Sequence, residues 1–439
     1  MPEIRAFRAL RYDPGQVVDL ALVVAPPYDV ISPARRALLA ARHPRSVVHV
    51  DLPVTEPGDD PDERYRRAGR TFAAWRSDGS LRRDDTPAVY VHEQVFVLPG
   101  SDERRVQRGF YARVRLEPLA PGSGIRPHER TLAGPKEDRL RLMRATEANL
   151  SGVVGLFENA TGTVGGLLAA VAGTPPAADV IDDDGVSSRL WVVPETGATA
   201  GVAAAIRAAA GAGPITISDG HHRYETALRY RDERRTAGSG DPDAPFDHLL
   251  MLLLDTASSP PVILPTHRVV RGLGRAADDL VAAVRPLFSV RPADRSTLLA
   301  TFRPGVEGAG GRGRFGLWTR SGGAILDAHP GAFEPNLPVA CPALRRLDVT
   351  ALAVALERIA GISREAITSG DRVAYTTSAE EAVAWVEAGE DGADAAFLLE
   401  PTRAAEVTAV AADGDVMPQK STYFYPKPLT GFVFNPLEW

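Results

Sequence analysis

The sequence predicts a mixed α/β (α+β) protein with two regions, residues 1–270 and residues 271–439. The first observation is an apolar run, Ile215–Ile217, that leads through a tight loop into a helical run. The second is a pair of long alternating segments, 88–98 and 106–116, which is typical of an antiparallel hairpin. The third is a new succession of helices and strands that begins near residue 271. Together these predict a mixed sheet with helices, followed by a second α/β domain.

The expected elements follow from apolar periodicity and from capping residues. Ser32 followed by Pro33 predicts a helix start, and Asp183, Asp184 and Gly185 predict a hairpin turn. We expect helices over residues 33–42, 62–77, 135–148, 161–172, 198–210, 224–234, 276–287, 349–359 and 379–388. We expect strands over residues 46–52, 88–98, 106–116, 153–157, 180–181, 189–193, 215–217, 249–254, 262–264, 372–376 and 395–399. A Gly-rich turn is expected over 308–313, and the tail from residue 417 has no clear periodicity.

Composition narrows the classes of protein. The chain has 439 residues, is 44% hydrophobic and carries a net charge of -6. This charge disfavours a general nucleic-acid binder, which usually has a basic face. The single cysteine, Cys341, excludes an intrachain disulfide and a multi-cysteine zinc site. The start of the chain does not resemble a signal peptide and no apolar run is long enough to span a membrane, so we expect a soluble cytoplasmic protein.

The loop Asp219–Arg223 is the first candidate site. A helix start offers backbone N–H groups and a positive dipole end, and Gly220 lets a ligand approach the backbone closely. Arg223 carries a planar fork suited to phosphate, and His221 or His222 could donate to a phosphoryl oxygen. The adjacent histidines are poorly placed to bind one metal ion together. The alternative is a structural turn whose polar groups satisfy one another.

The segment His128–Arg139 is the second candidate. Lys136 and Arg139 are three residues apart, so they share a face near the start of the predicted helix. Cations at a helix N-terminus oppose its dipole, and a bound anion would explain them. The alternative is a solvated face with internal ion pairs.

Three further segments are candidate walls of the same site. Asp29 lies in a rigid turn after Pro26 and Pro27, where its carboxylate could accept a hydroxyl proton or hold Mg²⁺, or simply cap the next helix. Pro265–Arg268 follows a predicted strand and could form a fourth wall. Residues 417–427 could form a fifth, or be a packed tail.

Lysine is scarce in this chain. Only three of the 50 Lys and Arg residues are lysines, namely Lys136, Lys420 and Lys427. A lysine that persists in such a composition can mark a position where a compact ammonium group is needed. All three lie in segments that stand out for other reasons, and chance is the alternative explanation.

Several motifs together resemble a known family. Asp219–Arg223, between a strand and a helix, resembles the Gly-x-x-Arg box of the ParB/sulfiredoxin-like superfamily, which includes partition proteins, sulfiredoxin and free serine kinases. In that superfamily the box is implied to hold nucleotide phosphates. Over nearly its full length the chain more closely resembles domain of unknown function 1015. The matching segments are 5–10, 25–31, 128–131, 134–139, 218–224, 264–268 and 420–427.

Two departures from the superfamily limit what the resemblance implies. No helix-turn-helix follows the nucleotide region, and the position of the reactive cysteine of sulfiredoxin holds histidine. A phosphotransferase or nucleotide hydrolase remains. We therefore expect a ParB/sulfiredoxin-like nucleotide-binding and catalytic region over 1–270, and an α/β domain with an aromatic and Pro-rich tail over 271–439.

The sequence as a whole predicts a nucleotide-dependent small-molecule kinase whose acceptor is a free hydroxylated metabolite such as serine. ATP, ADP or CTP would be the nucleotide, with Mg²⁺. A nucleotide-binding or hydrolysing regulatory protein is the alternative, and a ParB-like DNA-partition factor is the least favoured. A homodimer is a further expectation, with closure of the site as the other role for the second domain. The expected catalytic residues are Asp29, Glu129 and His222; the expected binding residues are His128, Lys136, Arg139, Asp219, Gly220, His221, His222 and Arg223; the expected metal ligand is Asp219.

Overall fold

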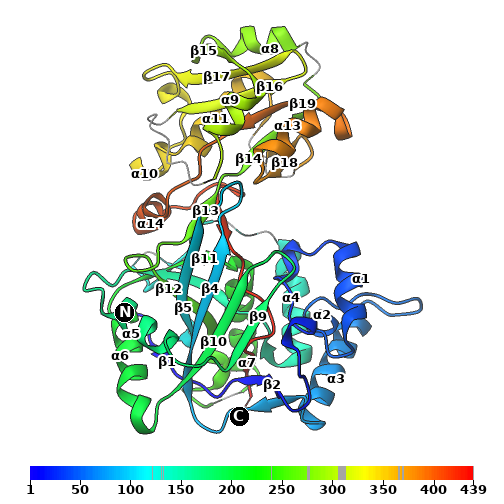
Figure 1. The fold of residues 1–439 in the computed structure, drawn as a ribbon, viewed down its shortest axis with the longest axis vertical. Coiled ribbons are helices and arrows are strands. Elements are labelled where there is room, and N and C mark those ends of the chain that lie inside the picture. Colours follow the sequence, from blue (N-terminus) through cyan, green and yellow to red (C-terminus); the bar gives the residue numbers. More distant parts are fainter. Residues whose placement is uncertain are drawn as a thin grey trace.

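The computed structural model contains two large β-sheets and three two-stranded ones among its described residues, and it confirms the mixed α/β class (Figure 1). It describes residues 1–120, 122–129, 131, 133–238, 240–273, 277–304, 313–363, 366–367 and 370–438. The predicted Gly-rich turn at 308–313 lies almost wholly outside these residues. Within the described part of the chain, no helix has the length and apolar character needed to cross a bilayer.

The larger sheet is mixed. Strand β11 runs parallel to β6 and antiparallel to β8, whereas β12 runs parallel to β8 and antiparallel to β5. β4 and β5 form the predicted long hairpin. In sheet order its described strands are β6 (Ile125–Arg126), β11 (Ile215–Asp219), β8 (Val153–Phe157), β12 (His248–Asp255), β5 (Arg104–Arg115), β4 (Ala88–Val97), β10 (Ser187–Pro194) and β9 (Ala178–Ile181), with β1 (Ile4–Arg5) paired to β5.

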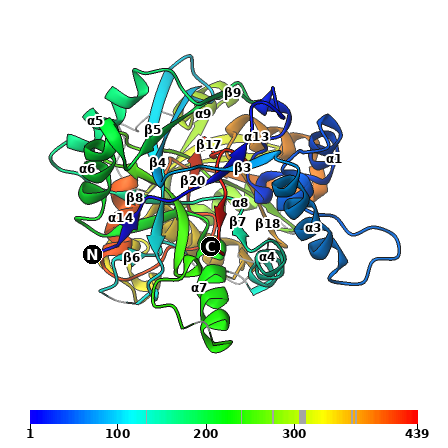
Figure 2. The same ribbon diagram turned by 90° about the horizontal axis from the view of Figure 1, so that it is seen from below.

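Helices lie on both sides of this sheet. Figures 1 and 2 show α5 and α6 on one side and α1 and α3 on the other. Ser32 caps α1 as predicted, because its hydroxyl accepts a hydrogen bond from the amide of Arg35 at 3.2 Å. The helices of this region are α1 (Pro33–Arg42), α2 (Val48–Asp51), α3 (Glu63–Ser77), α4 (Ala133–Thr146), α5 (Thr163–Ala172), α6 (Ala200–Ala210) and α7 (His221–Thr236).

The predicted strand over 46–52 is wrong, since this segment contains α2. Its β-branched valines favour a strand locally. Val47, Val48 and Val50 are instead buried in a core shared with α3, and the amide of Val47 donates to the carbonyl of Val23. Tertiary packing therefore overrides the local preference.

The smaller sheet belongs mainly to the second region. Strand β14 already begins at His267, a few residues before the predicted domain boundary at 270. In sheet order its strands are β15 (Phe288–Ala293), β17 (Gly322–Ala328), β16 (Arg314–Thr319), β19 (Ala393–Leu398), β14 (His267–Arg271) and β18 (Val373–Thr376). The described helices of this region are α8 (Ala277–Val284), α9 (Arg295–Thr301), α10 (Pro342–Arg345), α11 (Asp348–Ala360), α13 (Ala379–Ala388) and α14 (Ala404–Ala412).

The tail returns to the first region. Its strand β20 (Tyr423–Tyr425) pairs with β13 (Val262–Leu264), and β21 (Asn435–Pro436) pairs with β7 (Ala148–Asn149). The division of the chain at residue 270 stays a prediction, and both pairings join the tail to strands of the first region. The remaining strands are β2 (Leu10–Tyr12) and β3 (Leu81–Arg83); the 3₁₀ turns are η1 (Leu20–Leu22), η2 (Tyr28–Val30), η3 (Gly197–Thr199), η4 (Pro245–Asp247), η5 (Glu334–Asn336) and η6 (Glu390–Gly392).

Candidate functional site

The turn between β11 and α7 requires glycine. Gly220 has φ +93° and lies between Asp219, the last residue of β11, and His221, the first residue of α7. A Cβ atom at this position would stand 2.9 Å from Nη2 of Arg223. Both the left-handed backbone and the close approach of the guanidinium therefore exclude a larger side chain. The predicted strand–loop–helix turn is confirmed, with the helix beginning at His221 rather than at Tyr224.

The start of α7 suits an anion. Gly220 provides no side-chain cap, and the first turn holds no acidic residue. The first amide groups of a helix lack partners inside the helix and lie at the positive end of its dipole. A helix start of this kind is a common binding site for phosphate and carboxylate groups.

A buried ion cluster supports this helix start. Arg223 donates from Nη2 to Oδ2 of Asp219 at 2.7 Å, and the ammonium group of Lys427 pairs with Oδ1. Burial alone would raise the pKa of Asp219, but the Lys427 and Arg223 cations outweigh it and lower the pKa to about 2. Two cations thus pair with one carboxylate beside the helix start, and the Asp29 carboxylate also acts on both of them.

The guanidinium of Arg223 is oriented by protein groups. Its Nη1 donates to the hydroxyl of Ser151 at 3.0 Å and to the carbonyl of Gly152 at 2.6 Å. Both ends of the fork are therefore engaged within the protein. Arg223 contributes charge and order to the loop, and Lys427 contributes a second cation.

Two neutral histidines lie behind the loop. His128 Nδ1 lies 2.5 Å from the carbonyl oxygen of Ile217, so this nitrogen is the protonated one. Its Nε2 then accepts from the hydroxyl of Thr422 at 3.1 Å, and the amide of His128 donates to Nε2 of His221 at 3.2 Å. Burial lowers the pKa of both imidazoles. These two side chains hold the loop against the tail as uncharged groups.

A cavity of about 580 Å³ opens on this loop. Its volume lies within the range of small-molecule sites, roughly 300–1,000 Å³. The first region, the second sheet and the tail all contribute walls. The lining residues are Tyr28–Val30, Glu129 and Ser218–Arg223 from the first region, Thr266 and Tyr375–Thr377 beside the second sheet, and Lys420, Thr422–Phe424 and Lys427 from the tail.

Two carboxylates face this cavity besides Asp219. Asp29 lies in η2 and Glu129 in the loop after β6. Burial raises the pKa of Glu129 to about 7, although the backbone amide of Lys420 donates to its Oε1 at 3.4 Å. Glu129 therefore exchanges a proton near neutral pH, as a general base must.

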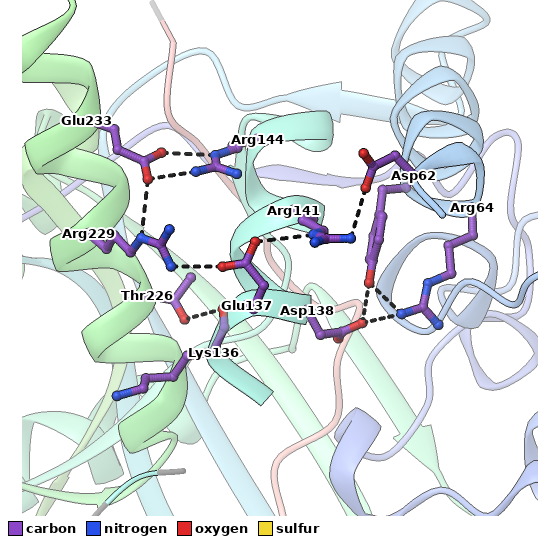
Figure 3. Close-up of polar contacts among 11 residues, drawn as sticks. Asp62, Arg64, Lys136, Glu137, Asp138, Arg141, Arg144, Thr226, Arg229 and Glu233 are labelled. Atoms are coloured by element: carbon purple, nitrogen blue, oxygen red, sulfur yellow. Dashed lines mark hydrogen bonds and ion pairs between the residues drawn. The ribbon is translucent and has the colours of Figure 1, made fainter. Parts of the chain in front are cut away.

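Lys136 and Arg139 are held elsewhere. Lys136 Nζ pairs with Glu225 at 2.8 Å, and Arg139 contacts Asp51, Asp138 and the ring of Tyr28. Figure 3 shows the surrounding network, in which α4 and α7 are joined through Glu137, Arg229, Arg144 and Glu233. Neither Lys136 nor Arg139 is among the described residues that line the cavity. The guanidinium of Arg139 packs against the ring of Tyr28, which itself lines the cavity, so Tyr28 separates Arg139 from the cavity.

The cavity also contains residues that were not among the expected catalytic and binding residues. Lys420 and Lys427 line the cavity, and the scarcity of lysine had marked both of them. Tyr375, Thr376 and Thr377 carried no sequence signal, because they lie in an ordinary amphipathic strand and the turn after it. The expected walls at Pro265–Arg268 and in the tail do contribute, through Thr266 and through the tail residues Lys420, Thr422–Phe424 and Lys427.

Comparison with known proteins gives one family match and several distant structural similarities. The model of the family described as "Protein of unknown function (DUF1015)" matches residues 4–350. No curated protein is similar enough to match. A conserved hypothetical protein from Pyrococcus furiosus is 13% identical over 69% of this chain and 87% of its own, with a TM-score of 0.32.

Two further solved structures are similar at the same level. A free serine kinase in complex with AMP is 13% identical over 74% of this chain and 91% of its own, with a TM-score of 0.34. SbnI from Staphylococcus aureus with a C-terminal truncation is 10% identical over 72% and 85%, with a TM-score of 0.35. Such distant similarities assign no activity to this chain.

Proposed function

The chain belongs to the DUF1015 family, as its motifs predicted, and we propose that this member is a nucleotide-dependent phosphotransferase acting on a small hydroxylated acceptor such as serine. The observation that carries the proposal is one cavity that combines an anion-binding helix start, lysines and two carboxylates. Phosphoryl transfer requires mainly positioning and cations around the transferred group, together with a group that orients the acceptor hydroxyl.

The phosphate-binding half is assigned to the start of α7 and to the tail. Backbone amides of the loop Gly220–Arg223 would donate to phosphate oxygens, as they do at other helix N-termini. Lys427 would add a compact charge, held in place by Asp219. His222 lines the cavity at the same turn, and burial lowers the pKa of its imidazole, so it would act as a neutral donor.

The acceptor half is assigned to Glu129 and Asp29. Either carboxylate would accept the proton of the acceptor hydroxyl as that oxygen attacks phosphorus. Glu129 is favoured because its pKa of about 7 matches the working pH of a general base. Asp29, which lies in η2 and lines the same cavity, is the second choice.

A nucleotide and Mg²⁺ both suit these residues. A bound nucleotide would supply the phosphoryl group, and Mg²⁺ would offset charge on its phosphates. Mg²⁺ commonly takes only one or two protein carboxylates beside phosphate oxygens, a role that Asp29 can fill. Among the described residues, no group of three His, Cys, Asp or Glu side chains is arranged to hold a metal ion. Asp219 would have to give up an ion pair with Lys427 or Arg223 to bind the metal.

The test is direct. Pure protein is incubated with ATP, ADP or CTP, Mg²⁺ and a set of hydroxylated metabolites that includes L-serine, and nucleotide consumption and phosphorylated product are measured. We expect one nucleotide to be consumed only when an acceptor is present. No consumption in any combination, together with a His222→Ala variant that binds nucleotide as tightly as the wild type, would overturn the proposal.

A nucleotide-binding regulatory protein is the second candidate. The observation that favours it is that residues of both sheet regions line the cavity. A bound ligand would contact both regions and would influence how they are positioned. This candidate predicts tight nucleotide binding with slow or no turnover, whatever the acceptor. A DNA-partition factor remains the least favoured, because the net charge is -6.

A further inference from the structure

Arg268 is a buried cation whose guanidinium lies over the ring of Tyr375, 5.7 Å from its centroid. It follows Thr266 and His267 at the start of β14 and is 4% exposed. Its Nη1 donates to the carbonyl of Thr266 at 2.5 Å and its Nη2 to the carbonyl of Lys420 at 3.4 Å. Among the described residues, no carboxylate pairs with it. Buried charges normally have an ionic partner, so this one leaves positive potential behind the cavity wall.

Thr266 carries a second unsatisfied group at the same place. It lines the cavity and is 8% exposed, and its hydroxyl has no hydrogen-bond partner in the described structure. A buried hydroxyl without a partner destabilises the folded state. An oxygen atom of a ligand could accept a hydrogen bond from it after a rotation about χ1.

Lys420 completes the group at the edge of the cavity. It has φ +57°, a left-handed backbone that is unfavourable for lysine. Its amide donates to Glu129 and its carbonyl accepts from Arg268, so its backbone bridges the proposed base and the buried cation. Lys420 is exposed and lines the cavity.

We propose that Thr266, Arg268 and Lys420 form a subsite for the carboxylate of the acceptor, so that the acceptor is a hydroxy acid or hydroxy amino acid rather than a neutral alcohol. The proposal rests on the proposed phosphotransferase function and specifies its substrate class. Lys420 and the Thr266 hydroxyl would contact the carboxylate, and Arg268 would act through them as a positioning residue. The adjacent Glu129 would then lie beside the hydroxyl of the same acceptor.

A nucleotide phosphate is the other anion that this group could attract. The two sources are separable because the start of α7 with Lys427 provides an independent phosphate site. A carboxylate subsite governs the KM of the acceptor and leaves the Kd of ADP unchanged. A phosphate subsite would instead govern the Kd of ADP and leave the KM of the acceptor unchanged.

The first measurement uses matched acceptor pairs on the full chain, L-serine against ethanolamine and D-glycerate against glycerol. Each is tested for phosphorylation with the active nucleotide and for binding to ADP-loaded protein by calorimetry. We expect the carboxylate-bearing member of at least one pair to react and bind at least about tenfold better, as expected for a charged hydrogen bond. Equal behaviour within both pairs would overturn the proposal.

The second measurement uses variants with matched controls. Thr266→Val and Lys420→Met should each raise the acceptor KM by about tenfold and leave the Kd of ADP within about twofold. Thr430→Val is the control for the first, because Thr430 also has a buried hydroxyl without a partner but lies outside the cavity lining. Lys136→Met is the control for the second. Both threonine variants should keep or raise the melting temperature, and only Thr266→Val should change the acceptor KM.

The outcomes separate this proposal from the proposed function. If ADP binds and no acceptor is phosphorylated, the proposed phosphotransferase function is wrong. Calorimetric binding of the acceptors to ADP-loaded protein then tests the carboxylate subsite on its own. Binding of L-serine or D-glycerate to ADP-loaded wild type that is lost in Lys420→Met supports the subsite. Absence of binding by both carboxylates, or an effect of Lys420→Met on ADP rather than on the acceptor, overturns it.

Discussion

Helix α4 and the C-terminal tail both carry lysines in a chain that otherwise uses arginine, yet their lysines have different surroundings. Lys136 of α4 is about one-third exposed and pairs with Glu225 on α7. The side chain of Lys427 in the tail is 13% exposed, pairs with Asp219 and lines the cavity. Both positions keep a lysine, and tertiary contacts decide whether its ammonium group joins two helices or lies beside a cavity.

Replacing Lys427 should have the largest effect. Lys427→Met leaves Asp219 with one cation instead of two, and loss of one hydrogen bond to a charged group lowers the free energy of unfolding by about 2 kcal/mol. It also removes the proposed phosphate contact, so ADP binding should be lost. Urea denaturation and calorimetric titration with ADP measure the two effects.

The double variant Lys427→Met/Asp219→Asn also removes the carboxylate that pairs with Arg223. Because Arg223 is 8% exposed and loses this partner, the double variant should be less stable than Lys427→Met. ADP binding should not return. Wild-type affinity for ADP in either variant would remove Lys427 from the proposed site.

Glu129→Gln should come next, with phosphotransfer falling by about 100-fold. Because the pKa of Glu129 is raised to about 7, its carboxylate form accumulates as pH rises through that value. The wild-type rate should therefore increase with pH below about 7 and level off above it, and Glu129→Gln should lose this rise. Rates between pH 5.5 and 8.5 (about three units) test this. A rise that persists in Glu129→Gln and disappears in Asp29→Asn would make Asp29 the base.

His222→Ala should weaken nucleotide binding by about tenfold, since one neutral donor is lost. Burial lowers the pKa of His222, so the loss should vary little above neutral pH. His222→Asn, which keeps a donor, should retain part of the affinity. Equal ADP affinity in all three proteins would exclude His222 from phosphate binding.

Lys136→Met should have the smallest effect. The pair with Glu225 is partly exposed, and pairs of this kind contribute less than about 1 kcal/mol to stability. ADP affinity should match that of the wild type. A loss of ADP affinity comparable to that of Lys427→Met would mean that α4 takes part in the site, so that Lys136 and Lys427 would both bind the ligand.

Local sequence patterns predicted the elements that build the loop, but not the partners that the loop acquires. Gly220 between an apolar strand and a helix was readable because backbone conformation depends on neighbouring residues. The strand predicted at 46–52 was wrong because its valines pack against α3. Lys427 and Asp219 are 208 residues apart, and they meet because the three-residue strand β20 pairs with β13. So short a strand has no detectable periodicity.

The candidate site shows the same limit. Asp29, Glu129 and the loop at 219–223 were predicted as separate motifs, and they do line one cavity. The pairing of Lys136 with Glu225 and the position of Arg139 behind Tyr28 depend on the packing of α4 against α7 and η2. Sequence spacing places both cations near a helix start but does not show which carboxylates surround them.

Binding of nucleotide phosphates at the start of α7 beside Lys427 can be measured by calorimetric titration of ADP into the wild type, Lys427→Met/Asp219→Asn and Lys136→Met. We expect the wild type and Lys136→Met to bind with equal affinity and the double variant not to bind. Unchanged binding by the double variant, or none by the wild type with any of ATP, ADP and CTP, would contradict this expectation.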